Sequence, residues 1–209
     1  MSQEELDNQL ENAAIWGNLE RLQELLSAGA NPGAVDIIGR TPLHLACING
    51  YAPCIAPLLN RGADPRAADS GGWTPLHLAC RYGHANCITP LLAADADPRA
   101  ADNSGGTPLH QACLYGYDNC IAPLLEAGAD PRAADKVGGT PLHDACINGH
   151  ANCIGQLLSS GADMSAEDNN ERTPRALAEE RNDEHGAACL EALEAWQRQV
   201  GRRTKPARP

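Results

Sequence analysis

The sequence predicts an all-α solenoid in which short helix pairs stack side by side along one axis. The first observation is a motif, Thr-Pro-Leu-His, that recurs every 33 residues without an insertion, at Thr41–His44, Thr74–His77, Thr107–His110 and Thr140–His143. The second is composition, because the chain of 209 residues contains no Phe and only 3% aromatic residues. Leu, Ile, Ala and Cys must therefore form the core, which suits thin layers of short helices better than one bulky centre.

Each period carries start and stop signals for two helices. In the first full period, Thr41 is a good N-cap and Pro42 suits the first helical position. Gly50 ends that helix, and a second helix ends at Gly62. The segment 63–73 has Pro, Asp, Ser and Gly-Gly, which is turn chemistry. Neither helix is long enough to be stable alone in water, so the repeats must stabilise each other by stacking.

This period and this motif resemble the ankyrin-repeat family, and the likeness runs from about residue 8 to about residue 199. The resemblance implies a β-hairpin-like finger at the segment 63–73 and at its equivalents. It also implies that the first-helix face and the finger tips line a concave groove that binds other proteins.

We expect one ankyrin-repeat domain over residues 1–200. It comprises an N-terminal capping unit, four full repeats and a C-terminal capping unit, over 8–40, 41–73, 74–106, 107–139, 140–172 and 173–200. The last unit begins with a truncated motif at Thr173, and its final helix is expected over about 184–199. Residues 201–209 are expected to form a basic, disordered tail.

Charge and hydropathy exclude several partners. The net charge is −11, and the last twelve residues hold five bases and no acid, which leaves 11 bases against 27 acids, or −16, in residues 1–197. So acidic a body repels phosphates, which argues against nucleic acid. The first eleven residues are polar and acidic, unlike a signal peptide, and no apolar run approaches the roughly 20 residues of a membrane helix. We expect a monomer in the cytoplasm or nucleus, without membrane contact.

Four histidines form a column at the repeat period: His44, His77, His110 and His143. Stacked helices lie about 8–10 Å apart, so neighbours in the column cannot share one metal ion. We therefore predict no metal site. The family resemblance implies instead that each His forms a hydrogen bond near the Thr of its own motif.

Eight of the nine cysteines form two further columns, which are Cys47, Cys80, Cys113 and Cys146, and Cys54, Cys87, Cys120 and Cys153. The polar N-terminus argues for reduced thiols, and a buried thiol packs as a small hydrophobe. Core packing is therefore favoured over zinc binding or redox sensing, although a contact of the Cys47–Cys54 type within a repeat stays geometrically open. Cys189 lies outside both columns and is the expected exception if any thiol reacts quickly.

No catalytic motif is present, so we predict that the protein is not an enzyme and has no catalytic residues and no cofactor. A Gly-rich phosphate loop, a nucleophile elbow and a His-Glu-x-x-His motif are all missing from the sequence. Acids are abundant, but they recur on turns at the repeat period. Arg66, Arg99 and Arg132 lie between two Asp columns, where we expect a ladder of surface ion pairs.

A helical wheel places Leu43, Ala46 and Cys47 toward the core and the positions of Leu45, Ile48 and Asn49 on the opposite side. These outward positions hold apolar and aromatic residues where polar ones are usual, which is typical of an interface. Ile48 and Ile147 could equally pack on neighbouring fingers, whereas Trp73, Tyr82 and Tyr115 favour the interface. The predicted partner-binding residues are Trp16, Arg40, Leu45, Ile48, Asn49, Trp73, Leu78, Arg81, Tyr82, Gln111, Leu114, Tyr115, Asp144, Ile147 and Asn148.

The favoured function is a protein-interaction module that binds a partner protein or peptide, one with basic flanks given the acidic surround. The alternative is a steric adaptor or inhibitor subunit of a larger assembly, for example a ubiquitin-ligase or kinase complex. A thiol-based sensor or enzyme is the third and least favoured hypothesis.

Proline recurs inside the expected second helices, at Pro57, Pro90 and Pro123, whereas Gln156 takes that place in the fourth full repeat. Proline in a helix interior costs about 3 kcal/mol. We expect each second helix to start near the position of Cys54, so that the proline falls in the first turn. Those three helices should then be shortened or tightened at their starts relative to the one with Gln156.

Overall fold

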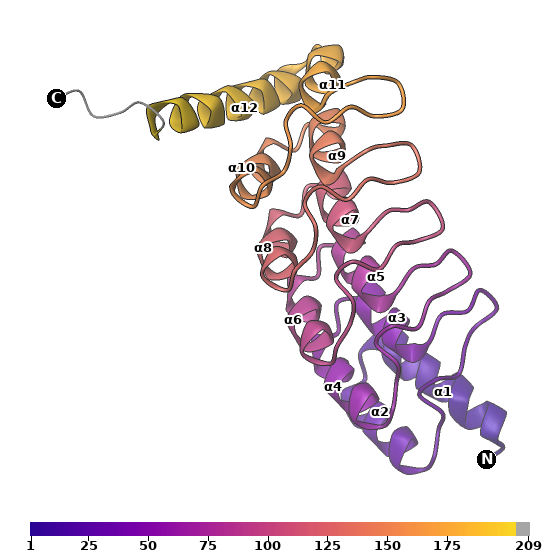
Figure 1. Cartoon of the computed structure of the whole chain (residues 1–209). Coiled ribbons are helices and arrows are strands. Elements are labelled where there is room, and N and C mark those ends of the chain that lie inside the picture. The colour runs from indigo at the N-terminus through magenta and orange to yellow at the C-terminus, as the bar shows by residue number, and fades with distance from the viewer. Residues whose placement is uncertain (204–209) are drawn as a thin grey trace.

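The computed structural model describes residues 1–203, with side chains as far as Val200, and in this range the chain forms helices and no strands. The helices form two rows (Figure 1). The row of inner helices is α1 (Gln3–Trp16), α3 (Pro42–Ile48), α5 (Pro75–Arg81), α7 (Pro108–Tyr115), α9 (Pro141–Asn148) and α11 (Pro174–Arg181). The row of outer helices is α2 (Leu19–Ser27), α4 (Ala52–Asn60), α6 (Ala85–Ala93), α8 (Asp118–Glu126), α10 (Ala151–Ser159) and α12 (Glu184–Arg203).

Contacts run between neighbours only, which is the organisation of a solenoid. The inner helix α3 packs on α1 and α5 on either side and on its own outer helix α4. The core is a continuous row of buried Leu, Ile, Ala and Cys side chains from Leu10 to Leu193. The predicted all-α solenoid is therefore confirmed.

The connections from each outer helix to the next inner helix form five fingers, which project to one side of the array (Figure 1). Each finger is a turn rather than a hairpin with paired strands. In the first, the Asp36 amide donates to the Arg40 carbonyl at 3.0 Å. Adjacent fingers are joined by one backbone hydrogen bond, such as that from the Ser70 amide to the Ile38 carbonyl at 2.9 Å. The fingers therefore stack on one another as the helices of the repeats do.

A ring seated on a glycine joins each of the inner helices α1, α3, α5 and α7 to the next repeat. Gly83, just after α5, has a φ of +74°, and a Cβ there would lie 2.5 Å from the Tyr117 ring. Gly50 faces His84 in the same way, and the His84 Nε2 also contacts the Ile48 carbonyl at 3.1 Å. Only glycine combines this left-handed backbone with so close an approach.

The second helices do not start where the prolines suggested. α4 begins at Ala52, two residues before Cys54, so Pro57 is its sixth residue rather than part of the first turn. α6, α8 and α10 have the same register and the same nine-residue length, although α10 carries Gln156 instead of proline. The prediction of shortened proline helices is therefore wrong. The prolines are half-buried, and the helix continues through them because packing of the flanking Ile and Leu residues fixes its path.

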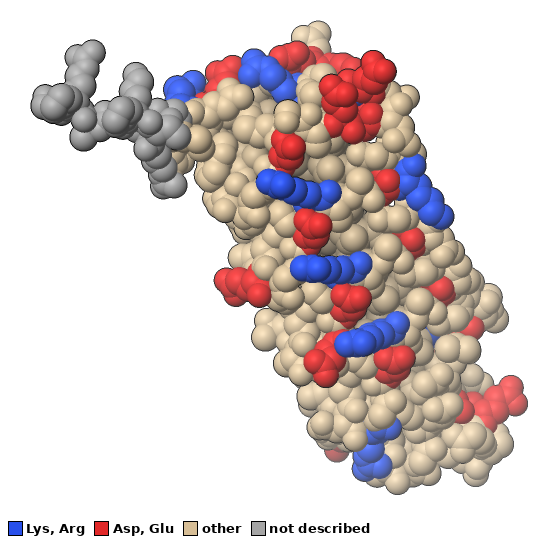
Figure 2. Space-filling model, in the orientation of Figure 1, with Lys and Arg blue, Asp and Glu red and all other residues tan. Residues whose placement is uncertain are grey.

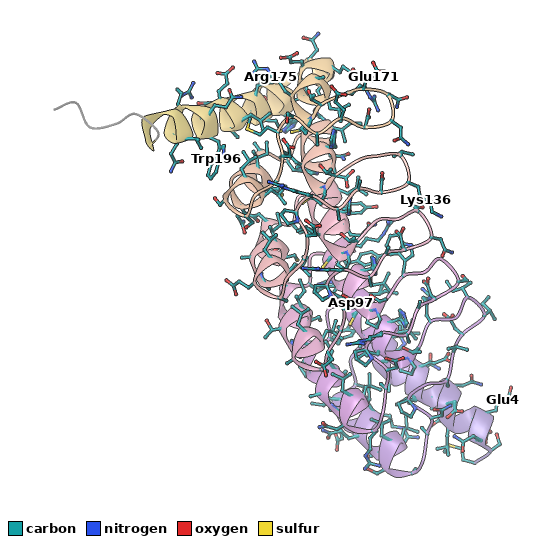
Figure 3. All side chains as sticks on the ribbon, viewed as in Figure 1. Glu4, Asp97, Lys136, Glu171, Arg175 and Trp196 are labelled. Carbon is teal, nitrogen blue, oxygen red and sulfur yellow. The ribbon has the colours of Figure 1, made fainter. Side chains whose placement is uncertain are left out.

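The end units extend further than the sequence indicated. α1 starts at Gln3, before the expected boundary at residue 8, and Ser2 and Glu5 form a capping box at its start. α12 runs to Arg203 and so includes the first three residues of the expected tail, whereas residues 204–209 lie outside the described residues. Trp196 packs against the core from α12, on the side of that helix next to α10 (Figure 3).

Candidate protein-binding face

The motif histidines are structural, as the resemblance implied. The Thr41 amide donates to His44 Nδ1 at 3.0 Å, so the ring proton is on Nε2, which donates to the Trp73 carbonyl of the next repeat at 2.9 Å. His77, His110 and His143 repeat both bonds. Both ring nitrogens are thus occupied and cannot bind a metal. Burial lowers the pKa of His44, His77 and His110, which keeps these rings neutral.

All nine cysteines are free thiols, and three thiol–thiol contacts join neighbouring repeats. The Cys47 thiol contacts Cys87, and Cys113 contacts Cys153 in the same way. Cys189, which lies outside both sequence columns, contacts Cys146 and is fully buried like the other eight. Burial raises the pKa of Cys47, which disfavours the reactive thiolate. The thiols therefore fill the core between repeats.

The expected ladder of ion pairs along the fingers is wrong. The Nε atoms of Arg66, Arg99 and Arg132 each donate at 2.6 Å to a backbone carbonyl of the next repeat, those of Asp95, Gly128 and Gly161 respectively. Carbonyl groups after a helix end lack intrahelical partners, so each guanidinium caps the outer helix of the next repeat. Figure 2 shows the resulting column of alternating basic and acidic side chains.

A row of partly or fully exposed side chains runs along the ends of the inner helices, which we call the inner-helix stripe. It consists of Trp16, Ile48, Asn49, Arg81, Tyr82, Leu114, Tyr115, Ile147 and Asn148. Trp16 is 75% exposed, Tyr82 45% and Tyr115 39%. Such exposure is unusual for aromatic side chains on short, well-packed helices, which makes this stripe the candidate contact surface.

Three predicted contact residues are instead buried. Leu45 is 4% exposed, and Leu78 and Gln111 are each 6% exposed. The expectation that they point into solvent is wrong because α3, α5 and α7 are each flanked by an inner helix on both sides and backed by an outer helix, so most of their circumference is covered. Asp144, in the same column, is only partly exposed, and burial raises its pKa to about 7, with a smaller contribution from Asp135.

Arg81 organises the centre of the stripe. Its guanidinium carbon lies 4.7 Å from the centroid of the Trp73 ring and 4.9 Å from that of Tyr115. Cation–π contacts of this kind hold an aromatic side chain in one orientation. Trp73 is half-buried, and Arg40, at the same position one repeat earlier, forms an ion pair with Asp36 at 2.7 Å. The aromatic surface between α5 and α7 is therefore preorganised.

A cavity of about 290 Å³ opens where this stripe meets the third and fourth fingers. It is lined by Trp73, Arg81, Asp102, Ser104, Gly106, His110, Gln111, Leu114, Asp135 and Asp144. Sequence reasoning missed this cavity because its carboxylates come from two fingers and one helix that only stacking brings together.

A repeated helix pair, a projecting finger and an exposed stripe along the inner helices define a helical-repeat protein with an extended binding face. A family pattern described as "Ankyrin repeats (3 copies)" matches residues 10–102, 58–135, 87–168 and 109–191. The chain therefore belongs to the ankyrin-repeat family. Ankyrin repeats generally mediate protein–protein interactions, and the fold is in general a non-catalytic binding scaffold.

Three plant potassium channels contain similar segments. KOR1 of Oryza sativa subsp. japonica is 45% identical over 47 residues, and KOR2 of the same plant is 52% identical over 40 residues. SKOR of Arabidopsis thaliana is 47% identical over 47 residues. These matches cover 19–22% of this chain and only 6% of each channel's length. Among the described helices of the present chain, none is long and apolar enough to cross a membrane.

Proposed function

We propose that the protein binds a partner protein or peptide across the inner-helix stripe, with Tyr82 and Tyr115 as the central contacts. The observation that supports this proposal is the exposure of these two rings at the ends of the adjacent inner helices α5 and α7. Each is stacked on a second ring, Tyr82 on His84 and Tyr115 on Tyr117, at centroid distances of 6.5 Å. Fixed aromatic side chains lose little conformational entropy on binding, which is why they dominate interface energies.

The chemistry of the partner follows from charge. The chain carries a net charge of −11. A partner with basic residues around an apolar or aromatic anchor would complement the stripe and its acidic surround, and attraction of opposite charges would speed association. Arg40, Ile48 and Asn148 belong to the same proposed face as peripheral contacts.

The test uses the partner captured from the native source, purified, and titrated by calorimetry against three proteins. The double variant Tyr82→Ala, Tyr115→Ala should weaken binding by roughly several hundred-fold, because each of the two central aromatic contacts contributes about 2 kcal/mol or more. The matched control is Glu126→Gln, which changes an exposed residue on the outer helix α8 and should leave Kd unchanged. Unaltered binding by the double variant, with an unaltered melting temperature, would show that the stripe is not the interface.

A second candidate, a steric adaptor or inhibitor subunit, uses the same face differently. The fingers and inner helices together present a long surface that one folded domain could cover (Figure 1). A short peptide from the partner should bind with most of the full affinity under the first proposal. Only the intact partner domain should bind under the second.

A further inference from the structure

Each finger contains an aspartate that closes its turn with one carboxylate oxygen. Oδ1 of Asp102 accepts hydrogen bonds from the amides of Ser104 at 2.7 Å and Gly106 at 3.0 Å. Asp36, Asp69, Asp135 and Asp168 use Oδ1 on the amides two and four residues ahead in the same way. The second oxygen, Oδ2, is not needed for the turn.

At the first and last fingers, an arginine four residues after the aspartate takes this second oxygen. Nε of Arg40 lies 2.8 Å and Nη2 2.7 Å from Asp36 Oδ2. Arg172 reaches Asp168 Oδ2 in the same way, with Nε at 3.0 Å and Nη2 at 2.8 Å. The Oδ2 atom of a finger aspartate can thus bind a guanidinium group while Oδ1 closes the turn.

In the third and fourth fingers the arginine position is glycine. Gly106 and Gly139 stand four residues after Asp102 and Asp135, and a Cβ on Gly106 would lie 3.2 Å from Asp102 Oδ2. Within the described residues, Oδ2 of these two aspartates accepts no hydrogen bond and forms no ion pair. Both aspartates line the cavity, and Gly106, the vacant arginine position next to Asp102, lines it as well.

Two further unpaired acceptors line the same cavity. Gln111 is 6% exposed, and its Oε1 has no hydrogen-bond partner in the described part of the chain. The Asp144 carboxyl group likewise makes no hydrogen bond or ion pair there. The lining base, Arg81, is stacked between Trp73 and Tyr115 and forms no ion pair with these acids. A buried acceptor without a donor costs free energy, so a ligand that brings hydrogen-bond donors into this cavity would be stabilised there.

We propose that this cavity receives one arginine side chain of the partner, whose guanidinium takes at Asp102 the place that Arg40 takes at Asp36 and Arg172 takes at Asp168. This inference rests on the proposed function, since it names a residue of that partner. A planar guanidinium offers five N–H donors to acceptors on several sides and is weakly hydrated. A lysine ammonium offers three donors from one point and fits this arrangement less well. At about 290 Å³ the cavity is smaller than most ligand pockets and suits a single side chain.

The test uses acetyl-arginine methylamide as the probe and NMR of the full chain as the readout. The Trp73 indole N–H and the Gln111 side-chain amide report on the cavity. Both resonances should shift saturably, with a Kd in the millimolar range expected of so small a ligand. Acetyl-citrulline methylamide, which has nearly the same shape but no charge, should produce no saturable shift.

The second part of the test uses a variant whose own side chain fills the arginine site. Gly106 has no left-handed φ, so Gly106→Arg can place its own guanidinium on Asp102 as Arg40 does on Asp36. This variant should lose the response to the probe and melt at a higher temperature than Gly106→Gln, which adds similar bulk without charge. A variant that had merely disrupted the finger would lose binding and stability together.

Three results would overturn the inference: no shift of either reporter with the arginine probe, equal shifts with citrulline or acetyl-lysine methylamide, or full binding by Gly106→Arg. None of these measurements involves the partner. Failure of the arginine pocket is therefore distinguishable from failure of the proposed function, which is decided by the effect of Tyr82→Ala, Tyr115→Ala on partner affinity.

Discussion

Asp144 occupies the position that Leu45 and Leu78 hold in earlier repeats, which is a mostly covered site between stacked helices. A carboxylate there loses hydration, and no base compensates it within the described residues, so its pKa rises from 3.8 to about 7. The folded state therefore binds a proton more tightly than the unfolded state does. The stability contributed by this proton is complete below about pH 4 and is lost as the pH rises through 7.

We predict that Asp144→Asn is more stable than the wild type at pH 8, by about 1–2 kcal/mol, and nearly equal to it at pH 4. The gain is smaller than the full pKa shift would give because partial exposure screens the charge. Urea unfolding at the two pH values measures it, with Glu126→Gln as the control. An equal effect of Asp144→Asn at both pH values would show that its carboxyl group is not responsible.

The column that contains Asp144 also shows where sequence reasoning failed. A helical wheel treats one helix against one core, and on that basis Leu45 should face solvent. In the array, α3 has α1 and α5 beside it, so a position opposite the core still lies between neighbours. The exposed Tyr82 and Tyr115 were predictable because they lie at the helix ends, beyond the flanking contacts. The unpaired Oδ2 of Asp102 was not predictable, because it results from the absence of an arginine side chain at Gly106.

At the scale of the helix, the capping residues in the sequence correctly predicted where the first helices start and end. Thr41 caps α3 and Gly50 follows that helix with a φ of +74°, as the sequence indicated. The prolines were different, because the start of α4 at Ala52 is set by the Tyr51 ring seated on Gly17 and not by the need to place Pro57 in a first turn. Packing between repeats thus overrides a local preference.

We predict that Pro90→Ala stabilises the protein. Pro90 is the sixth residue of α6, where an alanine amide would gain the hydrogen bond to the Asn86 carbonyl that proline cannot form. The expected gain in free energy of unfolding is about 1–2 kcal/mol, below the roughly 3 kcal/mol cost of an interior proline because proline also restricts the unfolded chain. Chemical denaturation measures it. Gln156→Pro is the reciprocal control and should destabilise α10; no change in either variant would contradict the argument.

For the whole molecule, the histidine column makes stability depend on pH in the opposite sense to Asp144. Burial holds the pKa of His44, His77 and His110 below the ordinary value of 6.5. Below pH 6.5 the unfolded chain therefore binds protons that the folded chain does not, and stability falls as the pH is lowered further.

We predict that the melting temperature drops by several degrees between pH 7.5 and pH 5 when measured in Asp144→Asn, where the opposing carboxyl effect is absent. For a chain of this size, 1 kcal/mol corresponds to about 2–4 °C. Calorimetry across this range is the measurement. A flat profile would indicate that the motif histidines can protonate in place.

Three kinds of hydrogen bond between repeats each span a fixed number of residues. The ring of His44 bonds a carbonyl 29 residues ahead, as does the guanidinium of Arg66, and one amide of each finger after the first bonds a carbonyl 32 residues behind. No such bond skips a repeat within the described residues, so every internal unit meets the same two neighbours whatever the total number of units. Duplicating residues 74–106 in tandem would preserve every one of these pairings and lengthen the binding face by one step. Duplication of a repeat can thus change the length of the binding face, while the contacts within the core and between neighbouring repeats stay the same.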